Sequence, residues 1–454
     1  MSISSVSKHI SPPQIIVIGY LGIILLGAIL LNLPAASSFG ESIGFLTAFF
    51  TSASAVCVTG LSVIEIGTAL SLFGQITLLV LIQIGGLGFM ITASLLFFLI
   101  GKRISLKERM VLQESMNENH LQGIVRMARN VIIVTAIIEG IGTLLLLIRF
   151  VPDFGIARGI FYSVFHSVSA FCNAGFDLLG RGDSLASYVS DPLVNFTIMG
   201  LIISGGIGFF VILELANHAV YTGRHKLSIH TKIALITTVL LIAAGFALFF
   251  VLEYSNPQTL GTLSPGGKII SALFESVTTR TAGFATVNQG NLLPESKLIA
   301  VILMFIGASP AGTGGGIKTT TFAAVTLAVV SIIRGQDDIN IFERKLNKQI
   351  AMRAVAITFF GITLIGLFTV IMSVAESNAF SLGSLLFELT SAFGTVGLST
   401  GITPQLSPFS LIVLIITMFA GRVGLLTLTI ALANRFANKS QNKIKYPEDK
   451  IMVG

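Results

Sequence analysis

The sequence is poor in charge, in cysteine and in tryptophan. Only 11% of its 454 residues are charged, whereas 53% are hydrophobic. A water-soluble protein needs far more charge to cover its surface, so this composition excludes a soluble globular chain. The two cysteines, Cys57 and Cys172, exclude a disulfide framework, and their spacing matches no zinc site. Tryptophan is absent, so any aromatic belt at a membrane surface consists of Tyr and Phe.

Long apolar runs occupy much of the chain instead. A helix of about 20 apolar residues crosses about 30 Å of hydrocarbon. Runs of this kind occur at residues 15–33, 72–100, 233–252 and 354–374. They predict an all-α integral membrane protein.

Four short segments of the sequence resemble one another. Each is a run of aromatic, apolar and small hydroxyl residues that ends in a short polar stretch, a glycine and then Leu or Phe. The four glycines recur at intervals of roughly 110 residues and are Gly60, Gly175, Gly283 and Gly397. After each segment comes a long apolar run with a second glycine-bearing core, at residues 85–88, 205–208, 315–318 and 421–424.

These two marks predict four tandem repeats, each with a spanning helix, a half-length helix, a glycine-bearing loop and a second spanning helix. The repeats cover residues 1–101, 102–222, 223–335 and 336–454. The third has a broken second span, and the fourth ends in a cytoplasmic tail. A half-length segment cannot cross the bilayer, and its loop is tolerated only where it is buried or lines a water-filled path. We therefore expect eight transmembrane helices with pseudo-fourfold symmetry around a central pore.

Basic residues gather in the segments that join the repeats and in the C-terminal tail. Examples are Lys102, Arg103, Arg344, Lys345 and Lys443. The positive-inside rule then predicts that both termini are cytoplasmic and that the half-length helices and their loops open outward.

The four loops are candidates for a potassium filter. Rings of backbone carbonyls can replace the hydration shell of K⁺, and glycine permits the backbone path that they require. None of the loop residues is a carboxylate, so carbonyl selection fits better than a ring of acidic side chains. The C-terminal ends of the half-length helices would also favour a cation. The predicted K⁺-binding residues are Val58, Thr59, Gly60, Asn173, Ala174, Gly175, Thr281, Ala282, Gly283, Thr395, Val396 and Gly397.

The second long run of the third repeat cannot form a continuous helix, because it contains Pro310 and five glycines between positions 307 and 316. We expect a flexible gate there, with a fixed kink as the alternative. The stretch also approaches a phosphate-binding motif, but Ile317 replaces the required glycine, which excludes a nucleotide site. The predicted gate residues are Gly312, Thr313, Gly314, Gly315, Gly316, Lys318 and Arg422.

Two arginines fall inside the repeat marks. Arg422 lies in an apolar span, where a charge is costly and therefore indicates a functional role. It is interpreted as a fixed positive barrier below the filter, as a donor that pins the broken helix, or as part of a structural pair. Arg280 lies three residues before Gly283. We expect it to turn away from the pore and to pair with Glu275 or Glu388.

On these residues the chain resembles the membrane subunits of the Ktr/Trk/HKT superfamily of potassium transporters, and within it the bacterial Ktr type. The carrying motifs are the four glycine loops, the stretch 84–89, the break at 312–316 and the core 421–424. The resemblance implies that the four glycines form the selectivity filter, that the break is an intramembrane gating loop and that Arg422 lies at the pore constriction. It also implies a homodimer docked on a cytosolic ring of nucleotide-binding regulatory subunits.

The predicted function is potassium uptake across the plasma membrane through a gated, channel-like pore. The main alternative is a sodium- or proton-coupled potassium symporter, in which broken helices bind substrate near the bilayer midplane, usually beside carboxylates. The region 312–316 has no carboxylate. Sodium would then be either an activator or the coupling ion. An enzyme would need a nucleophile–base pair or a metal cluster in the spans, and neither is found. We expect no cofactor in this chain, surrounding membrane lipid and no nucleic acid partner.

Overall fold

The computed structural model describes residues 11–100, 104–116, 123–179, 184–220, 227–336, 338–377, 379–424 and 427–428. Lys102, Arg103 and the basic tail lie outside these residues. Within the described part the chain is helical except for one short hairpin, formed by β1 (Ile339–Ile341) and β2 (Arg344–Leu346). Its two turn residues, Phe342 and Glu343, have positive φ, as a two-residue hairpin turn requires.

Four helices of the described part are by themselves long and apolar enough to cross a membrane: α1 (Pro12–Leu31), α7 (Ile124–Phe154), α11 (Ile229–Glu253) and α15 (Lys348–Ala375). Two bent pairs raise the number to six if each pair is one span: α4 (Leu72–Leu87) with α5 (Phe89–Ile100), and α9 (Pro192–Gly206) with α10 (Phe209–Val220). The chain therefore forms an all-helical membrane protein, and the arrangement in eight spans stays a prediction.

Four shorter helices follow the long ones, and each ends at one of the predicted glycine loops. They are α2 (Phe45–Cys57), α8 (Ile156–Phe171), α12 (Pro265–Thr278) and α16 (Leu382–Gly394). The predicted broken run of the third repeat is divided between α13 (Pro294–Phe305) and α14 (Thr319–Ile333), and α17 (Pro408–Val423) follows the fourth loop. The remaining helical pieces are η2 (Pro34–Ala36), α3 (Ile66–Ala69), α6 (Leu106–Ser115), η3 (Ala186–Tyr188), η4 (Gln289–Asn291) and η5 (Thr403–Gln405).

The apolar run 72–100 is not one straight span, as its composition suggested. The chain turns by 105° between α4 and α5, and by 100° between α9 and α10. The turning points are Gly88 and Gly208, with φ of +82° and +99°. Only glycine adopts such angles without steric cost, so in the first two repeats the last glycine of the second mark is the cause of the bend.

The long helices pack closely against the short ones through a contact that the first three repeats share. A serine hydroxyl of the short helix donates to a backbone carbonyl of the long helix, 2.7 Å away in each case. The pairs are Ser52 with Ile24, Ser167 with Glu139, and Ser276 with Ile242. A glycine follows three residues after each acceptor, and a Cβ added there would collide with the same serine; these glycines are Gly27, Gly142 and Gly245.

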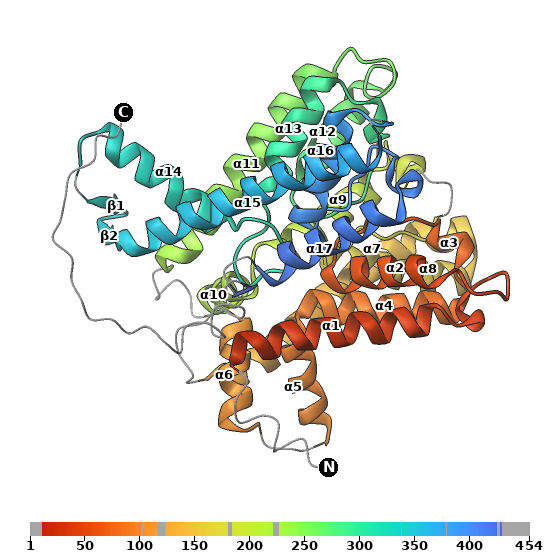
Figure 1. Cartoon of the computed structure of the whole chain (residues 1–454), viewed down its shortest axis with the longest axis horizontal. Helices are drawn as coiled ribbons and strands as arrows, with labels where there is room; N and C mark the ends of the chain where they lie inside the picture. The colour runs from red at the N-terminus through yellow and green to blue at the C-terminus, as the bar shows by residue number, and fades with distance from the viewer. Residues whose placement is uncertain are drawn as a thin grey trace.

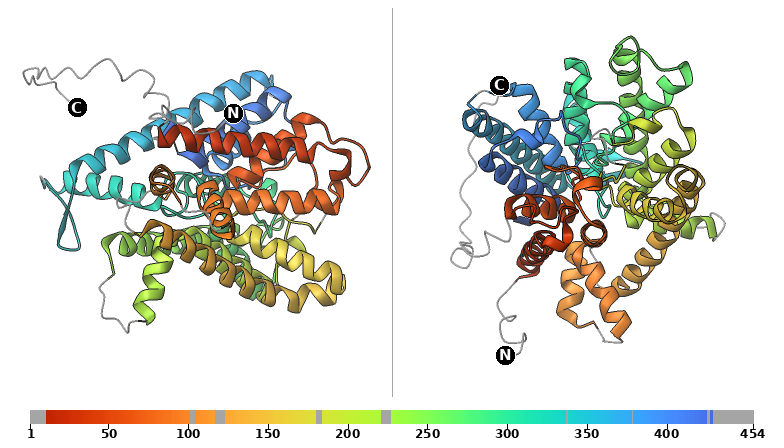
Figure 2. Two further views of the ribbon diagram at one scale, coloured as in Figure 1. Left: turned by 90° about the horizontal axis from the view of Figure 1, so that it is seen from below. Right: turned by 90° about the vertical axis from the view of Figure 1, so that its right-hand side faces the viewer.

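The long helices run roughly side by side across the molecule, and β1 and β2 lie beyond the ends of α14 and α15 (Figure 1). In the right-hand view of Figure 2 the parts of the chain follow one another around the molecule in sequence order, from red through yellow and green to blue. The four short helices and their loops are thereby gathered from all parts of the chain.

We expect Gly142→Leu to destabilise the protein, because a Cβ at this position would lie 2.6 Å from Ser167 Oγ and 2.7 Å from the Leu201 methyl groups. Overpacking of this kind costs about 1–3 kcal/mol. The matched control is Gly140→Leu in the same helix, where an added Cβ meets nothing within 4 Å. The apparent melting temperature in detergent, followed by circular dichroism, should fall for the first variant alone. Equal melting temperatures would contradict the packing role of Gly142.

Candidate functional site

The chain leaves each short helix in the same unusual backbone conformation. Val58, Asn173, Thr281 and Thr395 all have left-handed φ angles, between 50° and 74°. Residues other than glycine rarely adopt this region, because the Cβ approaches the carbonyl oxygen. The glycines that follow, Gly60, Gly175, Gly283 and Gly397, have φ between 67° and 95°. Four loops of different sequence therefore share one backbone path.

The four glycines lie together in a closed ring. A Cβ at Gly60 would lie 2.5 Å from the Ala174 carbonyl oxygen, and one at Gly175 would lie 2.7 Å from that of Ala282. A Cβ at Gly283 would likewise meet the Val396 carbonyl oxygen, and one at Gly397 would meet that of Thr59, which closes the ring. Each glycine thus lies against the carbonyl that precedes the next glycine in the ring, which leaves no room for any side chain. The structure brings together all twelve residues predicted for the filter.

Backbone hydrogen bonds turn the N–H groups of the loops back toward the short helices. The residue before each glycine donates to a carbonyl of its own helix, over 2.7 to 3.0 Å. These pairs are Thr59 with Ser54, Ala174 with Ser169, Ala282 with Thr278, and Val396 with Ser391. The carbonyl oxygens of the same four residues are the ones that lie against the neighbouring glycines.

A polar side chain in three of the short helices holds the segment that follows the glycine. Glu388 accepts hydrogen bonds from Ser399, Thr400 and Thr403 at 2.7 to 2.8 Å. Glu275 Oε2 accepts from Gln289 Nε2 at 3.0 Å. These two carboxylates were missed as site residues. The available signal was their shared place in the short helices, eight or nine residues before the glycine.

His166 occupies the corresponding place in α8 and is fully buried. The Leu178 N–H donates to its Nε2 at 3.4 Å, and its Nδ1 lies 2.7 Å from the Tyr162 carbonyl. His166 therefore holds the segment that follows the second glycine, as the two carboxylates do in their repeats.

The predicted pairing of Arg280 with Glu275 or Glu388 is also wrong. No ion pair of Arg280 occurs among the described residues. Its Nη2 instead donates to the Gly307 carbonyl at 3.3 Å, and the side chain is only 6% exposed. Donors of the outer loop occupy both oxygens of Glu388, and Glu275 bonds to Gln289 through Oε2. Arg280 therefore links the end of α12 to the beginning of the break after α13.

The break between Phe305 and Thr319 is tied to three repeats. The Ser309 and Thr313 N–H groups donate to the Gly206 and Gly205 carbonyls at 2.9 and 3.1 Å. The Gly315 N–H donates to Thr395 Oγ1, in the fourth glycine loop, at 2.9 Å. Lys318 Nζ donates within the break to the Gly314 carbonyl at 2.6 Å. The predicted gate residues 312–316 therefore lie against the glycine loops, and one of them, Gly315, is hydrogen-bonded to Thr395.

Arg422, in α17, joins the break to the first repeat. Its guanidinium donates to the Thr313 carbonyl and to the Gly85 carbonyl, and it reaches the Gly86 carbonyl at 3.2 Å. No ion pair of Arg422 with a carboxylate occurs within the described ranges. A planar fork of N–H donors reaches carbonyls of separate segments, whereas the ammonium of a lysine is a compact point charge.

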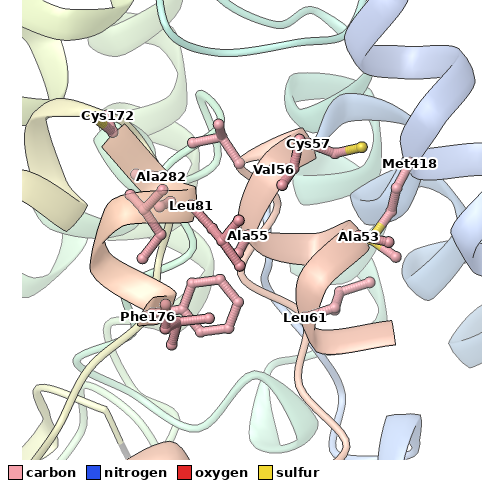
Figure 3. Packing of buried hydrophobic residues seen from close by; sticks show 14 of the residues in the cluster. Ala53, Ala55, Val56, Cys57, Leu61, Leu81, Cys172, Phe176, Ala282 and Met418 are labelled. Carbon is pink, nitrogen blue, oxygen red and sulfur yellow. The ribbon is translucent and has the colours of Figure 1, made fainter. Parts of the chain in front are cut away.

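Small apolar side chains fill the space around the ring. In Figure 3 Ala53 and Cys57 of α2 lie near Met418 of α17, and Cys172 lies on the other side of the view, near Ala282. Both cysteines are buried and free. Within the described residues, no group of three or more His, Cys, Asp or Glu side chains could hold a metal ion. The site therefore offers backbone oxygens rather than a side-chain cage.

A cavity of about 340 Å³ adjoins the glycine ring, with all four glycines in its wall. The segments that follow the glycines supply the rest of the lining, including Asp177 and Gln289. Glu65, at the beginning of α3, completes its acidic side.

Comparison with known proteins gives one consistent result. The model of the TrkH family, described as cation transport proteins, matches residues 15–443. "Ktr system potassium uptake protein B" of Bacillus subtilis is 40% identical over 98% of this chain and 97% of its own length. "Potassium/sodium uptake protein NtpJ" of Enterococcus hirae is 38% identical over 99% of this chain and 98% of its own.

Among solved structures, the potassium transporter TrkH of Vibrio parahaemolyticus has a similar fold, with a TM-score of 0.71. The match covers 95% of this chain and 87% of that one, at 18% sequence identity. The family resemblance seen in the glycine loops is confirmed over nearly the whole length: the chain belongs to the TrkH family of cation transport proteins, as a membrane subunit of the Trk/Ktr type.

Proposed function

We propose that this protein takes up potassium through a gated pore whose filter is the ring of four glycine loops. The observation that carries the proposal is the ring itself, in which four equivalent backbone turns converge and exclude every side chain. Relatives at 38–40% identity are named as potassium or potassium/sodium uptake proteins. Carbonyl rings of this kind replace the hydration shell of an ion that passes in single file.

The proposed architecture is four helix–pore loop–helix repeats with eight spans around a pseudo-fourfold axis. The bent pairs α4–α5 and α9–α10, the pair α13–α14 and the helix α17 would be the four second spans. The distribution of basic residues supports cytoplasmic termini and filter loops that open outward, in the plasma membrane.

The proposed gate is the break from residue 312 to 316, together with Lys318 and Arg422. A segment with this many glycines has few side chains to fix it, so its position depends on individual hydrogen bonds. Arg422 holds Thr313 and Gly85 at the same time, which supports the role of a latch across the pore.

The proposed assembly is a homodimer that binds a cytosolic ring of nucleotide-binding regulatory subunits. Two relatives are named as protein B of a "Ktr system", a name that implies further components. The phosphate-binding motif of this chain is incomplete, since Ile317 replaces a glycine, so nucleotide sensing would belong to another subunit.

A sodium- or proton-coupled symporter is the second candidate. The name of the Enterococcus hirae relative, which includes sodium, favours a role for Na⁺ as activator or coupling ion. The break at residues 312–316 contains no carboxylate for a coupling ion, which favours the channel-like pore.

Rubidium uptake distinguishes these candidates. In cells without their own potassium uptake systems, we expect this chain to restore saturable Rb⁺ uptake that persists without external sodium. Strictly sodium-dependent uptake would require a second measurement, in liposomes. Stoichiometric Na⁺ entry with Rb⁺ there would establish symport and overturn the channel-like pore, whereas Rb⁺ entry without Na⁺ flux would leave sodium as an activator.

We expect Gly60→Ser to weaken the discrimination between potassium and sodium, because its Cβ would push against the Ala174 carbonyl. A loss of about 1–2 kcal/mol would lower the K⁺/Na⁺ permeability ratio about 5- to 30-fold. Gly266→Ser is the control, since it adds the same atoms in the first turn of α12, where a Cβ meets nothing within 4 Å. Unchanged selectivity in a folded Gly60→Ser protein would argue against the filter.

Two substitutions of Arg422 separate a latch from a charge barrier. Arg422→Gln removes the charge, whereas Arg422→Lys keeps it but replaces the planar fork that spans two segments with a compact ammonium. If Arg422 is a latch, both variants should raise Rb⁺ flux about tenfold, equivalent to about 1.4 kcal/mol. Increased flux in Arg422→Gln alone would instead identify a charge barrier, and reduced flux in both would identify a structural role.

A further inference from the structure

We propose that an acyl chain of a membrane phospholipid binds in an apolar groove beside the break and holds the break in the position seen here. The groove is bounded by α13, α14, α15 and α16 and has a volume of about 450 Å³. The inference deepens the proposed function and rests on it, since a chain in this groove regulates uptake only if residues 312–316 form the gate. Binding of the chain can be measured without any ion flux.

The groove reaches both ends of the break. Ile306 and Ile317, which flank positions 307–316, both line it, and an isolated parallel β-bridge joins them. The Ile317 N–H donates to the carbonyl of Phe305, which also lines the groove, at 3.3 Å. Ile306 and Ile317 are almost fully buried in a closely packed interior, so the groove offers them the nearest free volume. An occupant of the groove would therefore restrict movement of the break.

The lining of the groove is suited to hydrocarbon. Apart from Gly366 and two threonines, the described residues that line it are aliphatic or aromatic. Thr358 donates its hydroxyl to the Ala354 carbonyl of its own helix at 2.9 Å, and Thr390 is buried. An ion or a polar ligand would lose its hydration on such a surface without gaining a partner, whereas an alkyl chain would lose nothing.

The groove continues the lipid-facing surface of α15. This helix is long and apolar enough to span a membrane, and the groove occupies its middle, from Thr358 to Gly366. Val355, Phe359 and Ile362 are exposed and lie on the same side of the helix as Gly366, at helical spacing. An exposed apolar stripe within a membrane span faces lipid, so the groove opens onto the acyl chains of the bilayer.

A basic residue lies at the beginning of the same stripe. Lys348, the first residue of α15, is exposed, and none of the ion pairs found among the described residues includes it. It lies about five helical turns from Gly366, and therefore on the same side of the helix. Thr358 lies about 15 Å further along the helix than Lys348, which is half of the hydrocarbon thickness. A phospholipid with its phosphate at Lys348 thus reaches the groove with the end of its chain.

The charge of Lys348 also favours a lipid over a second copy of this chain as the occupant. A second copy laid along the stripe would bury the Lys348 ammonium, which is costly without an acidic partner. A phospholipid supplies a phosphate at this place and hydrocarbon along the rest of the stripe, so it matches both ends of the site.

Lipid retention tests the binding. The full chain is reconstituted in vesicles of palmitoyl-oleoyl phosphatidylglycerol, extracted in mild detergent and weighed by native mass spectrometry. We expect the wild type to retain a phospholipid and Gly366→Phe to lose it, because a Cβ at Gly366 meets nothing within 4 Å and the ring would occupy the groove. Gly366→Leu, with a smaller side chain, should lose it in part, and Lys348→Gln should lower the retained amount.

Rb⁺ flux into the same vesicles tests the coupling to the break. Gly366→Phe places a permanent side chain where the acyl chain would lie, so it should lower the flux about fivefold, at the lower end of coupling between sites. Gly200→Phe is the matched control, because Gly200 lies in α9 outside this groove and an added Cβ there also meets nothing within 4 Å. This control should keep the lipid retention and the flux of the wild type.

Equal retention by the wild type and Gly366→Phe, or no retained phospholipid in the wild type, would overturn the lipid site. Conversion of a dimer to a monomer by Gly366→Phe, visible in the same mass spectra, would overturn it in favour of a second copy as the occupant. Loss of lipid with unchanged flux would overturn the coupling to the break. A wild type that retains lipid but conducts no Rb⁺ is the distinct outcome that would reject the proposed function itself.

Discussion

Irregular backbone within a bilayer must satisfy its polar groups without help from water, and this constraint shapes the centre of the molecule. Four helices end in its interior, and each end exposes carbonyls that no helical turn can satisfy. The left-handed residue after each helix directs the next N–H back to the helix, as Thr59 does to Ser54. The carbonyls of the loops are left facing the ring. Such a set of oxygens is suited to a cation, so one constraint accounts for both the conformation and the proposed selectivity.

The same constraint explains two arginines without carboxylate partners. The break after α13 has its own unsatisfied carbonyls, and Arg280 and Arg422 donate to those of Gly307 and Thr313. Each guanidinium supplies N–H donors to carbonyls at a place where no helix continues. An intramembrane charge is commonly interpreted as a mark of an ion pair or a proton relay. In this fold the two guanidinium groups instead bond to backbone carbonyls where a helix is interrupted.

The sequence predicted the parts of the site that repeat and failed where partners come from a distance. The spacing of Gly60, Gly175, Gly283 and Gly397 identified the loops, because a tight turn leaves a glycine at a fixed place in every repeat. The partner of Arg280 was mistaken because helical spacing says nothing of Ser399 and Thr403, which occupy Glu388 first.

The turn at Gly88 was missed for a related reason. The run 72–100 is apolar on both sides of the bend, so hydropathy has no signal there, and only the glycine marks the position. Length and apolarity alone identify four to six candidate spans in the described part, since α13, α14 and α17 are too short to pass by themselves. The repeat pattern is the argument for eight, and it depends on comparing segments rather than on hydropathy.

The proposed filter and the proposed gate are joined by hydrogen bonds, which limits how independently they could move. Thr395 belongs to the fourth glycine loop, and its hydroxyl holds the Gly315 N–H of the break. The Thr313 hydroxyl donates to the carbonyl of Phe171, the last residue of α8. Movement of the break would release both bonds together with those of Arg422. The two neutral bonds contribute about 0.5–1.5 kcal/mol each, and those of the charged guanidinium about 1.5–3 kcal/mol each, so opening would cost several kcal/mol. A regulatory ligand with a coupling energy of about 1–3 kcal/mol would shift such an equilibrium about 5- to 150-fold.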